Sequence, residues 1–449
     1  MKRVRILILE DNADRISAFR EAVAKLGDDI ELRIWHDAPT MIAEAEDWLE
    51  RAALISLDHD LNPMPGATGD PGDGLDVAKY LASLPPACPV ILHTSNVDRL
   101  WSMHNEFRFG GWQTERVGPI GDDWIPKFWL SKAREMIKTS TNTWPTRKSA
   151  DHAERMERAS LSLMGLGLGD ALGEMLSYRA EEAPRRLKEN LLPGGPWFHT
   201  DDTEMAISIV EVLRAHGFVH QDALARRFMK RFERDPDRGY GRMTRIQLRE
   251  MLAGAKWQDT AQAAFGGQGS MGNGAAMRVA PLGAFYADDP ARIVDEATAS
   301  SVVTHAHPEG VAGAIAVALA AGAAWRLRDD SGPARREAFF DAVIDLTPES
   351  KTRRGILLAA GTPADVPIQA VAKTLGNGFL VTAPDTVPYA LWCAANHLDD
   401  FVPSLADAIC TGGDCDTNAA IVGGIVALSV GLNRIPSDWV AAREPMDVK

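Results

Sequence analysis

The spacing of apolar residues changes once along this chain, and that change limits the folds open to it. Up to about residue 138, short apolar runs alternate with segments of helical spacing. Such alternation predicts an α/β domain built on a doubly wound parallel sheet. Beyond a polar stretch the spacing becomes helical almost everywhere, which predicts one all-α domain of ten or more helices. We therefore expect an α/β domain at 1–138, a linker at 139–152 and an all-α domain at 153–449.

The first domain is expected to gather polar residues at one edge of its sheet. Strands are predicted at Arg5–Leu9, Leu32–Trp35, Leu54–Leu57 and Val90–His93, with helices at Arg15–Leu26, Thr40–Ala52 and Leu75–Leu84. The carboxyl ends of parallel strands meet at one edge, and ligands bind at that edge in sheets of this kind. The polar residues expected there are Asp11, Asp58, His59, Asp60, His93, Thr94 and Ser95.

Charge and apolar patterning disfavour several classes of function. The 449 residues include 48 basic and 62 acidic ones, and a formal charge of −14 argues against non-specific binding to nucleic acid or to an anionic membrane. The longest apolar stretch, Val311–Trp325, is shorter than a membrane span. Asp11 ends the first apolar run, so no signal peptide is predicted. We expect a cytoplasmic protein without a membrane partner; its oligomeric state stays open.

Two short acidic clusters far apart in the sequence point to a site. They are Thr200-Asp201-Asp202-Thr203 and Asp414-Cys415-Asp416-Thr417, and each opens a segment of helical spacing. Asp and Thr also cap helices, so either cluster alone would not identify a site. Carboxylate and hydroxyl oxygens are, however, the ligands that hard divalent cations prefer. If the fold brings the two clusters together, they form a cage for one or two ions.

The motifs of the second domain, taken in order, resemble the ADP-ribosylglycohydrolase family over about residues 155 to 435. Besides the two clusters, these motifs are Gly165–Gly173, Arg238–Gly241, Gly269–Arg278, Thr304–Glu309 and Thr374–Gly378. The resemblance implies an all-α fold, a centre of two Mg²⁺ ions with Mn²⁺ as the alternative, and hydrolysis of a ribosyl glycosidic bond. The implied partner is an ADP-ribosylated macromolecule or a small molecule that contains ADP-ribose.

The resemblance also implies roles for single residues. The metal ligands map onto Thr200, Asp201, Asp202, Asp414, Asp416 and Thr417. Asp202 and Asp414 are also the aspartates expected to accept a proton from the attacking water. The loop that cradles ribose and diphosphate maps onto Ser270, Gly272, Asn273 and Gly274, where glycines expose backbone N–H groups to phosphate. His305 maps onto a position near the bound nucleotide.

One position departs from the family pattern. Relatives that cleave protein-linked ADP-ribose often carry a glutamate seven residues after the aspartate of Gly169-Asp170, and this chain has Ser177 there. Glu174 lies one helical turn earlier on the same face. Whether Glu174 serves as the catalytic acid or base in place of that glutamate, or lies outside the reaction, is open at this point.

The first domain resembles a response-regulator receiver, with Asp58 after the third strand and Thr94 after the fourth. His59 and His93 beside carboxylates are acid–base groups rather than phosphoryl acceptors, and no lysine clearly ends a fifth strand. In this the domain resembles receiver-like domains proposed to process cyclic phosphates. Two further functions therefore stay open. One is processing of ADP-ribose 1″-phosphate or 1″,2″-cyclic phosphate, with the first domain opening the cyclic phosphate. The other is a signalling protein that joins a regulatory receiver to an ADP-ribose-binding domain.

Overall fold

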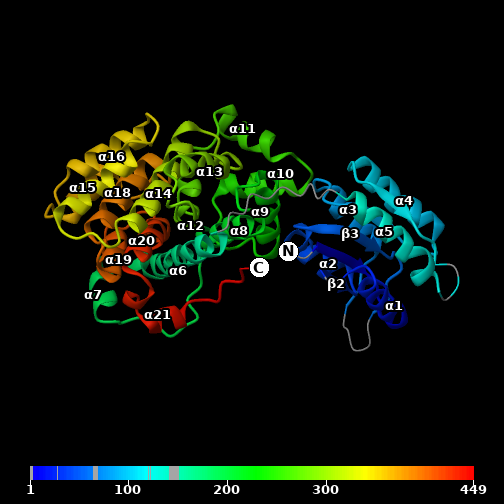
Figure 1. Cartoon of the computed structure of the whole chain (residues 1–449). Coiled ribbons are helices and arrows are strands. Elements are labelled where there is room, and N and C mark those ends of the chain that lie inside the picture. The colour runs from blue at the N-terminus through cyan, green and yellow to red at the C-terminus, as the bar shows by residue number, and fades with distance from the viewer. Residues whose placement is uncertain are drawn as a thin grey trace. The chain divides into compact units, whose positions relative to one another are not determined.

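The chain divides into two compact units, Met1–Thr146 and Arg147–Lys449, each described here by itself (Figure 1). The structure is a computed structural model that describes residues 4–27, 29–63, 69–119, 121, 123–140 and 151–448. Most of the expected linker, residues 141–150, lies outside the described residues.

The first unit is a five-stranded parallel sheet in the order β2-β1-β3-β4-β5. Its elements are β1 (Val4–Leu9), α1 (Ala13–Ala24), β2 (Ile30–Trp35), α2 (Ala38–Leu49), β3 (Ala52–Leu57), α3 (Gly74–Ala82), β4 (Val90–Leu92), α4 (Val97–Phe109), β5 (Thr114–Arg116), the π-helical η1 (Ile125–Trp129) and α5 (Leu130–Thr139). The doubly wound α/β fold is thus confirmed, while α4, β5 and α5 are not predicted by the apolar spacing.

Helices cover both faces of this sheet because alternate strand residues point to opposite sides. Leu7 and Leu9 of β1 belong to a cluster with Met41 of α2 and with residues of α3 and α4. Ile6 and Ile8 belong to a second cluster with α1, η1 and α5. Strands buried on both faces are typical of parallel sheets, so polar side chains gather where the strands end.

The second unit is helical throughout, apart from isolated bridges such as that between Gly272 and Thr382. Its elements are α6 (His152–Leu176), η2 (Ser177–Glu182), α7 (Ala183–Lys188), α8 (Asp201–His216), α9 (Gln221–Arg234), α10 (Arg242–Leu252), α11 (Trp257–Gly267), η3 (Asn273–Ala275), α12 (Ala280–Phe285), α13 (Pro290–Val302), α14 (Pro308–Arg326), α15 (Pro333–Ile344), α16 (Lys351–Gly361), α17 (Ile368–Leu375), α18 (Ala383–Asn396), α19 (Phe401–Cys410), α20 (Cys415–Val430), η4 (Leu432–Arg434) and α21 (Ser437–Ala442). The predicted all-α domain is confirmed.

Close contact between α6 and α20 organises the second unit. A Cβ built at Gly169 of α6 would lie 1.9 Å from the backbone oxygen of Ala419, and one at Gly173 would lie 2.3 Å from that of Cys415. Only glycine permits so close an approach of two helix backbones. The contact holds the first turn of α20, where the second acidic cluster lies, against α6.

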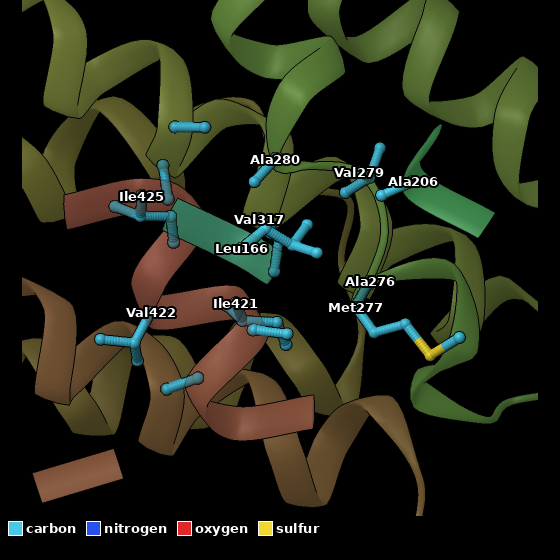
Figure 2. Close-up of a cluster of buried hydrophobic side chains, with 14 of the residues drawn as sticks. Leu166, Ala206, Ala276, Met277, Val279, Ala280, Val317, Ile421, Val422 and Ile425 are labelled. Atoms are coloured by element: carbon cyan, nitrogen blue, oxygen red, sulfur yellow. The ribbon is translucent and has the colours of Figure 1, made fainter. Parts of the chain in front are cut away.

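The core of the second unit forms around these two helices. Figure 2 shows side chains from α6, α8, α14, α20 and the η3–α12 segment in one cluster, with Leu166, Ala206, Ala276, Met277, Val279, Ala280, Val317, Ile421, Val422 and Ile425 labelled. Within the described chain, α14 is the one helix long and apolar enough to cross a membrane, but 78% of its most apolar window is buried inside the unit. Its place in the core accounts for that composition.

Candidate functional site

The N-termini of α8 and α20 meet at one cavity of about 540 Å³. Asp201 and Asp202 reach it from α8, and Asp414, Asp416 and Thr417 reach it from the start of α20. Two acidic clusters far apart in the sequence therefore lie at one site, and the volume suits a small-molecule ligand. Thr200 is buried immediately before α8.

Helix capping explains part of the arrangement of the first cluster. Thr200 is the N-cap of α8, and its Oγ1 accepts a hydrogen bond from the Asp202 N–H at 3.3 Å. Carboxylates in the first turn also complement the helix dipole. These roles do not use every oxygen, because Asp202 Oδ1 is buried without a hydrogen-bond partner among the described residues. Capping alone therefore does not account for the cluster.

Asp170 of α6 fastens the start of α8 to the centre of the unit. Its fully buried carboxylate accepts hydrogen bonds from the N–H groups of Thr200 and Thr203 and, at 2.5 Å, from the Thr203 hydroxyl. Burial raises the pKa of Asp170 to about 6, and the charge of Asp416 adds to that rise. The sequence analysis did not include Asp170 in the site; its position after Gly169, which packs on α20, was the available signal.

The cavity carboxylates repel one another in a buried setting. Burial, followed by the charges of Asp416 and Asp170, raises the pKa of both Asp201 and Asp202 well above its ordinary value. Burial and the charge of Asp416 raise the pKa of Asp414 to about 8. A divalent cation is the natural counter-charge for such a group of oxygens. Together with the unpartnered Asp202 oxygen, this donor set fits one or two hard cations.

These carboxylates surround the cavity rather than meet at one point. Among the described residues, Glu10, Asp58 and His93 of the first unit form the one group that brings three candidate ligand atoms within 4.8 Å of one another. Among the same residues, the cavity carboxylates of the second unit form no such group of three, a spread that is compatible with two ions.

The glycine-rich loop lines the same cavity and contacts the second cluster. Asn273 Nδ2 donates hydrogen bonds to Asp414 Oδ2 at 2.6 Å and to Thr386 Oγ1 at 3.0 Å. Both amide hydrogens are therefore engaged within the protein, and Asn273 can reach a ligand only through Oδ1. Ser270 Oγ accepts from the Gly272 N–H at 3.2 Å, which helps to shape the loop.

His305 lies against this loop because two of its residues lack side chains. A Cβ at Gly272 or at Gly274 would lie 3.2 or 2.9 Å from His305 Nε2. The other ring nitrogen, Nδ1, lies 2.8 Å from Thr304 Oγ1. Burial, with a further contribution from Arg278, lowers the pKa of His305 to about 3, so the imidazole is neutral at physiological pH.

Two bulky residues on the cavity lining have strained backbones, which no motif in the sequence indicates. Phe265 and Val381 have φ values of 52° and 53°, which are uncommon for residues with large side chains. Both side chains are more than half exposed, as is that of Leu380 beside Val381. Strain of this kind gathers at ligand-binding sites.

Glu174 does not line the cavity, but its charge reaches the second cluster. Partial burial and the nearby charge of Asp416 raise the pKa of Glu174 above its ordinary value. Ser177, at the position of the missing family glutamate, directly follows α6 as its C-cap and donates a hydrogen bond to the backbone oxygen of Glu174 at 2.9 Å. Of the two positions, Glu174 is therefore the one that offers a carboxylate close enough to Asp416 to feel its charge.

A second polar cluster lies at the carboxyl edge of the sheet in the first unit. Leu9 pairs with Leu57 and Leu57 pairs with Leu92, so the residue after each strand falls side by side with the others. Those residues are Glu10, Asp58 and His93, and all three are buried. Glu10 was missed because the sequence analysis took the next acidic residue, Asp11.

Charge within this cluster is partly balanced by a basic residue that the sequence analysis also missed. Arg15 Nη1 lies 3.0 Å from Asp58 Oδ2 and 3.7 Å from Glu10 Oε2. His93 Nε2 lies 3.4 Å from Glu10 Oε2. Burial raises the pKa of Asp58, opposed first by the charge of His93.

The other predicted residues of this edge lie in neighbouring interactions. His59 Nδ1 lies 2.8 Å from Asp60 Oδ1, and His59 Nε2 lies 3.6 Å from Asp73 Oδ2. His59 therefore has other carboxylate partners than His93, which lies beside Glu10. Asp11 accepts hydrogen bonds from the backbone and side chain of Asn62. Thr94 Oγ1 donates a long hydrogen bond of 3.5 Å to Asp60.

Comparison with known families gives a match for each unit. The chain matches the ADP-ribosylglycohydrolase family over residues 151–448 and the cyclic-phosphate processing receiver domain over residues 8–108. ADP-ribosylhydrolase ARH3 of Xenopus tropicalis is 32% identical over 330 residues, covering 63% of this chain and 90% of that protein. ADP-ribosylarginine hydrolase Tri1 of Serratia proteamaculans is 25% identical over 301 residues, covering 64% and 75%.

The chain is also similar in part to solved structures. An ADP-ribosylglycohydrolase-related protein complex has a TM-score of 0.47 at 26% identity, covering 65% of this chain and 94% of that one. The response regulator domain of Thermotoga maritima CheB has a TM-score of 0.24 at 15% identity, covering 30% and 97%.

Proposed function

The chain belongs to the ADP-ribosylglycohydrolase family, and from this premise we propose that it hydrolyses the ribosyl glycosidic bond of an ADP-ribosylated substrate or of a small ADP-ribose derivative. The observation that carries the proposal is the convergence of Asp201, Asp202, Asp414 and Asp416 on one cavity that the glycine-rich loop also lines. In the reaction the bond from the anomeric carbon to the acceptor breaks and a bond to a water oxygen forms, through an oxocarbenium-like state.

We assign the residues that would hold two Mg²⁺ ions, or Mn²⁺, to the oxygen donors around the cavity. When bound, such ions supply orientation of the ribose hydroxyls and activation of a water molecule. Support comes from the mutual repulsion of the buried carboxylates and from the unpartnered oxygen of Asp202. The proposed ligands are Thr200, Asp201, Asp202, Asp414, Asp416 and Thr417.

The protein's own groups position the reactants. Asp170 holds the first turn of α8, and Asn273 fixes the orientation of Asp414. Asp414, with Asp202 as the second candidate, is the proposed acceptor of the water proton. The exposed N–H groups of the glycine-rich loop are the proposed contacts of the diphosphate.

The proposal is tested by release of ADP-ribose from peptides ADP-ribosylated on serine or on arginine, with Mg²⁺ present. Replacing Asp414 and Asp416 together by Asn should lower kcat by about 10²- to 10³-fold, because oriented charge at the reacting centre is lost. The control is Asp345→Asn, at an exposed position at the end of α15. Circular dichroism should show unchanged helix content; full activity of the double variant would refute the assignment.

Glu174 is proposed as the acid or base that replaces the family glutamate. Glu174→Gln keeps the shape of the side chain and should lower kcat by about 10²-fold with little change in KM, the size expected for general acid–base catalysis. Its neighbour Ser177, changed to Ala, serves as the control. If kcat of Glu174→Gln equals that of the unchanged protein, Glu174 has no part in the reaction.

A second candidate function is favoured by the match of the first unit to a cyclic-phosphate processing domain. Here the first unit would open ADP-ribose 1″,2″-cyclic phosphate by adding water across one P–O bond, giving ADP-ribose with a phosphate monoester and a free hydroxyl on its terminal ribose. His93 and Asp58 would act with Glu10, and the other predicted residues of this edge, Asp11, His59, Asp60 and Thr94, would line the approach.

Full-length protein and a His93→Gln variant should be incubated with that cyclic phosphate and followed by chromatography. This function is supported if the unchanged protein opens the cyclic phosphate and the His93→Gln variant does not. Unchanged substrate with both proteins, together with phosphorylation of Asp58 by a small phosphodonor, would favour a regulatory receiver joined to an ADP-ribose-binding domain.

A further inference from the structure

Arg278 is a fully buried arginine that forms no ion pair among the described residues. Its Nη2 donates hydrogen bonds to the Ser300 carbonyl at 3.1 Å and to Thr304 Oγ1 at 3.0 Å. Its guanidinium also lies over the ring of Phe228, 4.5 Å from the centroid. The charge of Asp201 acts on the guanidinium without forming an ion pair. A buried charge is costly, and the hydrogen bonds and the ring contact of Arg278 help to offset this cost.

The Thr304 hydroxyl stands between this arginine and His305. Thr304 Oγ1 has two partners, Arg278 Nη2 and His305 Nδ1 at 2.8 Å. Arginine is only a donor, so the hydroxyl oxygen must accept from it. Among the described residues, the one acceptor that the hydroxyl hydrogen reaches is Nδ1. Buried polar groups satisfy their hydrogen bonds, so Thr304 donates and Nδ1 carries no proton.

A neutral imidazole has one N–H proton. If Nδ1 is unprotonated, this proton is on Nε2. His305 Nε2 lies against the glycine-rich loop, close to Gly272 and Gly274, on the lining of the cavity. Arg278 keeps its charge at neutral pH, since burial lowers its pKa only to about 9. The direction of donation, from Arg278 through Thr304 to His305, is therefore constant over the physiological range.

We propose that Thr304, oriented by Arg278, is a positioning residue that holds His305 in the tautomer with its proton on Nε2, so that the imidazole donates a hydrogen bond to an acceptor atom of the ligand. This rests on the proposed function, because it takes the ligand of the cavity to be an ADP-ribosyl group. It adds a constraint on that ligand: the atom at this position is a hydrogen-bond acceptor, such as a phosphate oxygen or an unprotonated ring nitrogen.

The first test reads the tautomer in the ligand-free full-length chain labelled with ¹⁵N-histidine. The signals of His305 are assigned by their loss in His305→Gln. We expect Nε2 protonated and Nδ1 unprotonated. Thr304→Val removes the hydroxyl and should give a mixture of tautomers, whereas Thr304→Ser should keep the original one. A proton on Nδ1 in the unchanged protein would overturn the proposal.

The second test measures ADP-ribose binding by calorimetry with the same variants. Loss of one oriented hydrogen bond should weaken binding by Thr304→Val about five- to tenfold, and Thr304→Ser should restore it. Thr347→Val is the matched control, because Thr347 is also buried and its hydroxyl donates only to the Val343 carbonyl, in the last turn of α15. The proposal fails if Thr304→Val keeps both the tautomer and the affinity.

The two tests separate this proposal from the function on which it rests. If the unchanged protein does not bind ADP-ribose, the proposed function fails, and the tautomer in the ligand-free chain still decides the role of Thr304.

Discussion

At the scale of single residues, the cavity is marked by carboxylates that lack basic partners. Glu204, in the same helical turn as Asp201 and Asp202, provides the contrast. Arg231 lies 2.8 Å from Glu204 and Arg234 also contacts it. Despite burial, hydrogen bonds from His199 and Arg231 lower the pKa of Glu204 to about 2. The neighbouring Asp201 and Asp202 have raised pKa values instead, and a cation bound in the cavity would offset the repulsion that contributes to this rise.

The pH dependence of stability follows from these shifts. A carboxyl whose pKa is higher in the folded than in the unfolded state binds more protons when folded, so stability falls as pH rises. His305 and Glu204 act in the opposite direction, but only below about pH 6.5. Between pH 6.5 and 8 the group led by Asp414 dominates.

Without divalent cations the melting temperature should therefore fall from pH 6.5 to pH 8, and Mg²⁺ should raise it more at pH 8 than at pH 6.5. Thermal scans with EDTA or Mg²⁺ measure this. Equal stabilisation by Mg²⁺ at both pH values would contradict the assignment of cation ligands, and Asp414→Asn should reduce the difference.

The aspartates of the two acidic clusters could be predicted as site residues from the sequence. Residues whose role depends on contacts with distant parts of the chain could not. Asp201, Asp202, Asp414 and Asp416 stand in short clusters of unusual composition, and the structure places all four at one cavity. Asp170 and Arg278 stand inside two of the glycine-rich motifs, but the local sequence does not show which polar groups each of them contacts. Glu10 and Asp11 are adjacent acidic residues after the first strand. Only the register of the strands shows that Glu10, and not Asp11, lies beside Asp58.

At the scale of elements, the site depends on how closely α6 approaches α20. Gly169→Ala places a methyl group 1.9 Å from the Ala419 carbonyl, and the two helices must separate to admit it. Overpacking of this kind should lower the free energy of unfolding by about 2–4 kcal/mol. Gly361→Ala is the helical control, since nothing lies within 4 Å of its added Cβ. Urea unfolding measures both; equal stability of the two variants would contradict the packing argument.

Elements with strong apolar periodicity were predictable, and short polar ones were not. Strands β1 and β3 are mostly apolar, with one polar residue each, and were expected within one or two residues of their bounds. Strand β5 is only Thr114–Arg116 and has no apolar residue, so its pairing with β4 decides its structure. Trp112 before β5 and Trp129 after it are buried in the core, while Phe109 stays exposed.

At the scale of the whole molecule, each unit has its own core and its own polar cluster. If the two proposed activities belong to separate sites, their losses should be independent. His93→Gln in the full chain should leave the rate of ADP-ribose release from peptides within about twofold of the original rate, the size of change expected when two sites are independent. The Asp414/Asp416 double variant should open the cyclic phosphate at the original rate. Loss of both activities in either variant would show that the sites depend on each other.

The central claim is that aspartates from α8 and α20 bind shared divalent ions beside the ribose of the ligand. The most direct measurement is the anomalous scattering of Mn²⁺ in crystals of the full chain grown with Mn²⁺ and ADP-ribose. We predict peaks between Asp201–Asp202 and Asp414–Asp416, next to the ribose hydroxyls. Ordered ADP-ribose in the cavity with no anomalous peak between these carboxylates would contradict the claim.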